Sequence, residues 1–176
     1  MPPVVVDETE GPWGRATAVF SPDRSHRYLL TRTWDESSPV VNFVMLNPST
    51  ADAFALDPTN RRCVDFAQRW GCGALVTTNV FAWRSTDPTA LRTVADPIGP
   101  ANDAVLVETA RRADLVIAAW GVHAAYDDRG MQVQRMLVDA GVELQALRLT
   151  RGGHPGHPLY VPAATVPALW SAPDCT

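Results

Sequence analysis

The sequence contains no lysine, and all fifteen of its basic residues are arginine. Without a lysine amine the chain cannot form a lysine Schiff base, so a covalent amine mechanism would have to use the N-terminus. An excess of positive charge is also missing, because the formal net charge is −4. Non-specific binding to nucleic acid increases with the number of phosphates that a protein neutralises. A broadly basic nucleic-acid surface is therefore not expected, although a local arginine patch is still compatible with the composition.

Cysteine is scarce, and its spacing predicts neither disulfides nor a metal site. The three cysteines, Cys63, Cys72 and Cys175, include no C-x-x-C pair. A disulfide framework, a zinc site and an iron–sulfur cluster each need more cysteines or a different spacing. We therefore expect no metal and no cofactor, and free cysteines are typical of a reducing cytoplasm.

Long apolar runs are also missing. No stretch approaches the roughly 18 to 20 apolar residues that a membrane-spanning helix needs. The N-terminus begins Met1-Pro2-Pro3, continues with Asp7 and Glu8, and lacks the basic start of a signal peptide. We therefore expect a cytoplasmic protein with no membrane partner.

A length of 176 residues suits one domain with a complete core and is short for two. We expect a single domain over residues 1–176. It would comprise an N-terminal hairpin at 16–34, an α/β core at 40–162 and a short C-terminal tail.

Apolar runs alternate with helical patterns through the core. Helical spacing and capping residues predict helices at about 60–70, 102–113 and 127–140. Strands are predicted at 40–46, 74–80, 114–120 and 142–149. This alternation predicts an α/β fold, namely a three-layer α/β/α sandwich with a mainly parallel four-stranded central sheet, plus the N-terminal β-hairpin.

Polar loops follow three of these predicted strands. Asn47-Pro48-Ser49-Thr50 follows the first strand, Asn79 ends the second, and a loop with His154 and His157 follows the last. Ligands in such sheets bind at the carboxyl ends of the strands. We therefore expect Asn47, Asn79 and a histidine to face one pocket.

The order of these motifs resembles that of the uracil-DNA glycosylase superfamily. Leu46 to Ser49 is similar to its first motif, of the type G-x-[DN]-P-G, and Thr78 to Arg84 is similar to its asparagine-containing strand end. Ala119-Trp120-Gly121 matches a later strand that closes on Leu-Gly. The final motif of the superfamily, H-P-S, is similar to either His154-Pro155-Gly156 or His157-Pro158-Leu159 of this chain. The resemblance covers roughly residues 40–162 and implies a glycosylase-like fold.

The resemblance implies hydrolysis of an N-glycosidic bond, with catalytic roles for Asn47 and for His157 or His154. Asn47 would hold the attacking water, and the histidine would donate to the departing base. An amide is not a general base, so a modest rate is expected where the superfamily has a carboxylate. Asn79 would read the base. Further substrate contacts are expected from Ser49, Thr50, Trp83, Tyr160, Arg84 and Arg151, the two arginines contacting phosphate and the aromatics stacking on a base.

A closer resemblance is to an uncharacterised bacterial domain family of unknown function. Three motifs carry it, N-P-S-T-A-D from Asn47, D-P-T-x-R-R-C from Asp57, and a terminal H-P-L-Y from His157. This family brings no established activity.

Three functions stay open at this stage. The first is a monofunctional glycosylase that acts on a damaged or modified base in DNA. The second is a hydrolase or binder of free nucleosides or nucleotides, and the third is a non-catalytic module that binds modified nucleic acid. A structural alternative exists for each motif, since Asn47 to Thr50 also suits a strand-to-helix turn and Asp57 suits a helix cap. The oligomeric state is not predicted.

Overall fold

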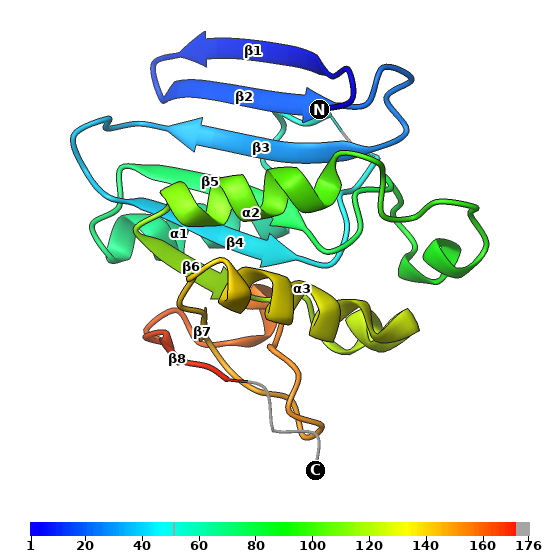
Figure 1. Cartoon of the computed structure of the whole chain (residues 1–176). Coiled ribbons are helices and arrows are strands. Elements are labelled where there is room, and N and C mark those ends of the chain that lie inside the picture. Colours follow the sequence, from blue (N-terminus) through cyan, green and yellow to red (C-terminus); the bar gives the residue numbers. More distant parts are fainter. Residues whose placement is uncertain (51, 172–176) are drawn as a thin grey trace.

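The computed structural model describes residues 1–50 and 52–171. Ala51 of the N-P-S-T-A-D motif and Cys175 lie outside the described residues. Within the described ranges, eight strands form one sheet and helices lie against both of its faces (Figure 1). The strands are β1 (Val5–Gly11), β2 (Gly14–Phe20), β3 (Arg27–Thr33), β4 (Val40–Met45), β5 (Ala74–Asn79), β6 (Leu115–Ala118), β7 (Gln145–Ala146) and β8 (Ala168–Leu169). The α-helices are α1 (Pro58–Arg69), α2 (Asn102–Arg112) and α3 (Arg129–Asp139), and short 3-10 helices are η1 (Pro88–Arg92), η2 (Val122–Asp128) and η3 (Pro158–Tyr160).

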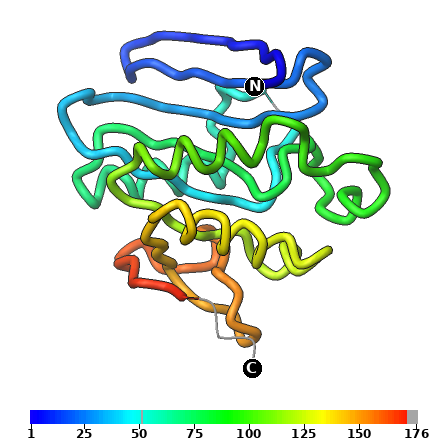
Figure 2. Tube along the Cα trace, in the orientation of Figure 1, coloured from blue at the N-terminus to red at the C-terminus, as the bar shows by residue number. Residues whose placement is uncertain are grey.

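The strand order across the sheet is β1-β2-β3-β5-β4-β6-β7-β8. The pairs β5/β4, β4/β6 and β6/β7 are parallel. The pairs β1/β2, β2/β3, β3/β5 and β7/β8 are antiparallel. The N-terminal strands and the C-terminal strand therefore lie at opposite edges of the same sheet (Figure 2).

The predicted three-layer α/β/α sandwich with a mainly parallel four-stranded central sheet is wrong. Among the described residues, most strand pairings are antiparallel and the sheet has eight strands. The N-terminal strands are part of the sheet, because β3 pairs with β5 through Leu30 opposite Thr77. The sequence pattern missed β1, whose residues alternate between half-buried and exposed and include acidic side chains typical of a solvated edge. It also overestimated the strand at 142–149, of which only Gln145 and Ala146 form a strand of the sheet, while Leu149 makes an isolated bridge with Pro155.

Helix α1 begins where its sequence predicts. Asp57 is the N-cap, and its Oδ1 accepts a hydrogen bond from Asn60 N at 2.7 Å. Pro58 occupies the first turn, where its missing N–H is not needed. Gly71, with φ of 75°, follows the C-cap Trp70. These capping residues set where α1 begins and ends along the chain.

The two faces of the sheet bury different helices. Phe66 of α1 packs with Phe43 of β4 on one face. Leu106 of α2 and Leu137 of α3 pack with Val116 of β6 on the other. Figure 1 shows α2 and α3 in front of the sheet and α1 behind it. Burial on both faces explains why β4 and β6 are apolar at nearly every position, while β5 is buried throughout although it ends in Thr77, Thr78 and Asn79.

Candidate functional site

A cavity of about 570 Å³ lies at the carboxyl ends of the parallel strands β4, β5 and β6. We call it the carboxyl-end cavity. Its wall includes the segment after β4, the end of β5, the segment after β6, the start of α1 and the segment around η3. Of the predicted site residues, Asn47, Ser49, Asn79, His157 and Tyr160 line it. Loops far apart in the sequence thus meet at one edge of the sheet, the usual ligand position in sheets with parallel strands.

Asn47 is held with its amide oxygen free. Its Nδ2 donates to Ser85 O at 2.9 Å and to Pro48 O at 3.2 Å. No described residue donates to Oδ1, and Asn47 is only half-buried in the cavity wall. Asn47 therefore offers the cavity a hydrogen-bond acceptor.

Asn79 is buried at the end of β5 and lines the cavity. Its backbone carbonyl accepts a hydrogen bond from Asn102 Nδ2 at 2.9 Å. Its side-chain amide makes no hydrogen bond to the described part of the chain. Asn79 thus presents both a donor and an acceptor to the cavity.

His157 has a defined tautomer. It is the N-cap of η3, and its Nδ1 accepts a hydrogen bond from Leu159 N at 3.2 Å. Nδ1 therefore carries no proton, and Nε2 carries the proton of the neutral ring. Burial lowers the pKa of His157, while the charge of Asp57 acts in the opposite direction. A neutral imidazole with a donating Nε2–H lines the cavity at neutral pH.

The other predicted residues do not line this cavity. His154 is half-buried, whereas Thr50 and Arg151 are exposed. Trp83 packs edge-on against His26, with ring centroids 5.3 Å apart. Arg84 donates to the backbone carbonyls of Arg24 at 3.0 Å and Thr50 at 3.1 Å, so it ties two loops together.

Tyr160 lies at the rim of the cavity. The residue is 76% exposed, and its ring centroid is 5.6 Å from that of His157. Arg62 of α1 fixes this segment by donating to the carbonyls of Pro158 and Val161. The aromatic ring is therefore available to a ligand that enters the cavity.

The sequence patterns missed several lining residues. Arg27, at the start of β3, is the most unusual, because it is a buried arginine in the cavity wall. Thr77 precedes Asn79 on the same face of β5, and Trp120 contributes a buried aromatic wall. The sequence predicts Arg27 only as part of a hairpin strand, and no sequence signal links that hairpin to the cavity. Asp57 both caps α1 and lines the cavity.

Polar side chains from α2 and α3 form a network that supports the end of β5. Asn102 Nδ2 donates to Asn79 O and to Val80 O. The buried Arg129 donates through Nε to Val80 O at 2.8 Å and forms an ion pair with Asp103 through Nη2. These contacts fix the backbone from which Asn79 projects.

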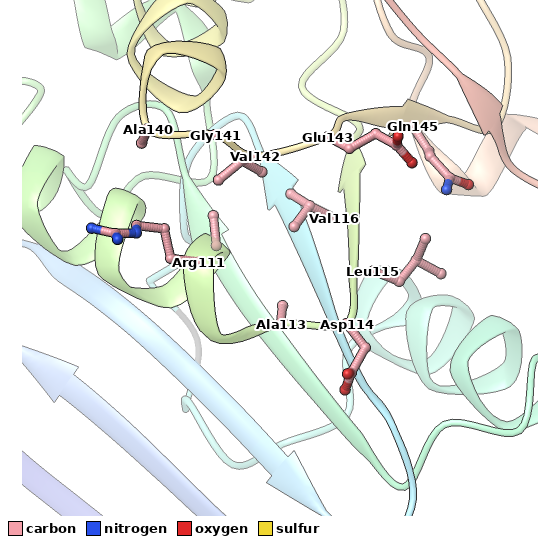
Figure 3. Close-up of a pocket in the computed structure, with 11 residues that line it drawn as sticks. Arg111, Ala113, Asp114, Leu115, Val116, Ala140, Gly141, Val142, Glu143 and Gln145 are labelled. Carbon is pink, nitrogen blue, oxygen red and sulfur yellow. The ribbon is translucent and has the colours of Figure 1, made fainter.

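A second cavity, of about 430 Å³, lies at the amino ends of β6 and β7 (Figure 3). We call it the amino-end cavity. Its charged residues, Arg111, Asp114 and Glu143, are exposed. Asp114 Oδ2 already accepts a hydrogen bond from Val40 N at 2.8 Å. Because none of its described lining residues has a buried polar atom without a partner, the amino-end cavity is the weaker candidate site.

Within residues 1–50 and 52–171, no group of three or more His, Cys, Asp or Glu side chains is placed to hold a metal ion. Cys63 and Cys72 are free and buried, and burial raises the pKa of both thiols. No helix in the described ranges has the length and apolarity needed to cross a membrane.

Comparison with known proteins gives one match. No curated protein and no solved structure matches the chain. None of the comparisons shows a likeness to the uracil-DNA glycosylase superfamily. A family model described as "Protein of unknown function (DUF1643)" matches residues 27–159, a range that extends from Arg27 to Leu159 and thus spans most of the carboxyl-end cavity. The chain belongs to this family.

Proposed function

We propose that the carboxyl-end cavity binds a nucleobase and that the protein hydrolyses the N-glycosidic bond of that base. One observation carries the proposal: Asn47, Asn79 and His157, predicted from separate motifs, line one cavity. Each offers a different hydrogen-bonding group to a base. Asn47 offers an acceptor oxygen, Asn79 offers an amide that both donates and accepts, and His157 offers a donating Nε2–H. The base would come from DNA or from a free nucleoside or nucleotide.

Asn79 suits recognition of a base. A planar amide with a free donor and a free acceptor matches the amide-like edge of a pyrimidine in a bidentate manner. The network of Asn102 and Arg129 holds its backbone in place. Trp120 and Tyr160 supply aromatic surface on which a base can stack.

The hydrolytic step uses the remaining two groups. The C1′–N bond breaks with its electron pair left on the base, and the His157 Nε2–H stabilises the negative charge that develops there. Asn47 Oδ1 accepts a hydrogen bond from the water whose oxygen bonds to C1′, and the proton that the water loses passes to solvent. Because no lysine is present, the sugar product cannot form a lysine Schiff base and the strand stays intact.

The test is release of free base, measured by liquid chromatography and mass spectrometry. Substrates are oligonucleotides that contain uracil, hydroxymethyluracil, hypoxanthine or other modified bases, together with the matching nucleosides and nucleotides. Replacing His157 by alanine is expected to lower turnover by about 100-fold. His154→Ala is the matched control, because His154 lies in the same segment and does not line the cavity.

A non-catalytic binding module is the second candidate, because Asn47 is an amide and the carboxylate of Asp57 already accepts two hydrogen bonds from Asn60. Base binding that depends on Asn79, without turnover, would establish that function. Absence of both binding and turnover across the panel would overturn the assignment of a nucleobase site.

A further inference from the structure

Arg27 is a buried cation without a partner. Arg27 is only 4% exposed, yet it lines the carboxyl-end cavity. Its Nε is buried without a hydrogen-bond partner, and no described residue accepts a hydrogen bond from Nη1 or Nη2, although the backbone N–H donates to Ala82 O at 2.9 Å. No carboxylate of the described chain lies within ion-pair distance of it. Proteins rarely bury a charge unpaired, because the loss of hydration destabilises the fold.

Burial and neighbouring arginines both disfavour the charged form of Arg27. The pKa of Arg27 is lowered to about 10, mainly by burial and also by the positive charges of Arg84 and Arg32, while the charge of Asp57 acts in the opposite direction. The guanidinium therefore remains charged at neutral pH. An anion in the cavity would relieve both the lost hydration and the repulsion from Arg84.

One neighbouring side chain also suits an anion. Thr77 Oγ1 is buried without a hydrogen-bond partner in the same cavity wall. Helix α1 also begins in this wall, but the carboxylate of its N-cap Asp57 already accepts the hydrogen bond of Asn60 N, so the helix N-terminus is not part of the subsite.

We propose that Arg27 and Thr77 form an anion subsite that binds the phosphate group of a nucleotide, so that the cavity takes a phosphorylated ligand. The nucleotide part of this inference rests on the proposed base site, whereas the anion part rests on Arg27 and Thr77 alone. The flat fork of arginine donors matches phosphate oxygens, and charge-assisted hydrogen bonds of this kind are strong. A cavity of about 570 Å³ lies within the usual range for small-ligand sites.

The experiment compares pyrimidine nucleoside 5′-monophosphates with the corresponding nucleosides by isothermal titration calorimetry. Wild type is expected to bind the monophosphates at least about tenfold more tightly. Arg27→Met is expected to remove this difference. Inorganic phosphate is expected to raise the melting temperature of wild type but not that of Arg27→Met.

Arg32→Met is the matched control. Arg32 lies on the same strand, is also buried, and has an unpaired Nε, but it donates to Phe54 O at 2.6 Å and does not line the cavity. This variant is expected to keep the preference for monophosphates. Circular dichroism confirms that both variants are folded.

The outcomes separate the two proposals. Equal affinity of wild type for nucleoside and monophosphate would overturn the phosphate subsite and leave the base site intact. Binding of phosphate through Arg27, without any binding of nucleosides or contribution from the base, would support the subsite and overturn the base site. A single-stranded oligonucleotide without terminal phosphates completes the panel. If its binding depends on Arg27, the phosphate comes from a strand, and if only the monophosphates depend on Arg27, the ligand is a free nucleotide.

Discussion

Two buried arginines near the end of β5 differ in whether the guanidinium group has a partner in the protein. Arg129, 3% exposed, donates to Val80 O and pairs with Asp103. Arg27, 4% exposed, lies in the wall of the carboxyl-end cavity without a partner in the described chain. The first arginine contributes to the fold, because its donors satisfy a backbone carbonyl and a carboxylate. The second reduces the stability of the free protein, as expected of a group whose partner is a ligand.

Removing the paired arginine should have the largest effect. Arg129→Met leaves Val80 O with one donor fewer and Asp103 without its cation, so we predict a loss of about 3 kcal/mol in the free energy of unfolding. Urea denaturation measures it. Arg111→Met, at an exposed position of α2, is the control and should change stability by less than about 0.5 kcal/mol. Equal effects of the two variants would contradict a structural role for Arg129.

Asn47 combines a paired nitrogen with a free oxygen, so it tests the same contrast within one side chain. In Asn47→Asp a carboxylate oxygen replaces the Nδ2 that donates to Ser85 O and Pro48 O. We predict a loss of about 1.5 kcal/mol in the free energy of unfolding at neutral pH, since two oxygens then face each other without a proton. Protonation of the new carboxyl restores a donor, so the loss should shrink in acid. An Asp variant as stable as wild type at neutral pH would show that Nδ2 is not the bonded atom.

Removing the unpaired arginine, Arg27, should raise the free energy of unfolding, whereas removing Arg129 should lower it. Arg27→Met replaces an unpaired buried charge with an apolar side chain, and we predict a gain of about 1 kcal/mol in the free energy of unfolding without ligand. Urea denaturation in phosphate-free buffer measures it. A loss of stability would mean that Arg27 has a partner in the free protein.

The smallest effect concerns His157. Burial lowers its pKa in the folded protein below the ordinary value of 6.5 that it has in the unfolded chain. The unfolded chain therefore binds the proton first as the pH falls. The contribution of His157 to stability is unchanged above about pH 6.5 and decreases as the pH falls from there towards the folded-state pKa.

His157→Gln removes this dependence. The stability of wild type relative to the variant should be lower at about pH 5.5 than at about pH 7.5, as measured by urea denaturation at both values. The other three histidines are present in both proteins, so their contributions cancel. A relative gain of wild-type stability in acid would contradict the assigned neutral imidazole.

The sequence predicted the local elements better than the sheet. Capping by Asp57 and the spacing of Cys63, Phe66 and Ala67 predicted α1, because these signals act within a few residues. The pairing of β3 with β5 was missed, because strand pairing over more than forty residues leaves no local pattern. The edge strand β1 was missed because its half-buried positions include Asp7, Thr9 and Gly11, so no apolar alternation marks it.

The same distinction applies to the candidate site. Asn47 directly follows a predicted strand, Asn79 ends one, and His157 lies in the loop after another, so their positions could be predicted from strand-end loops. Arg27 could not be predicted, because it reaches the cavity only through the long-range pairing of β3. The sequence predicts Arg84 and Arg151 as phosphate contacts because they lie beside the loops in sequence, yet neither lines the cavity.

Arginine side-chain NMR tests the central contrast most directly. In a spectrum of the Nε–Hε groups, titration with pyrimidine nucleoside monophosphates should shift the Arg27 resonance and leave that of Arg129 unchanged. This result is predicted because Arg27 Nε has no partner in the free protein, whereas Arg129 Nε donates to Val80 O. An unchanged Arg27 resonance with every nucleotide, or shifts confined to residues of the amino-end cavity such as Arg111, would contradict the account.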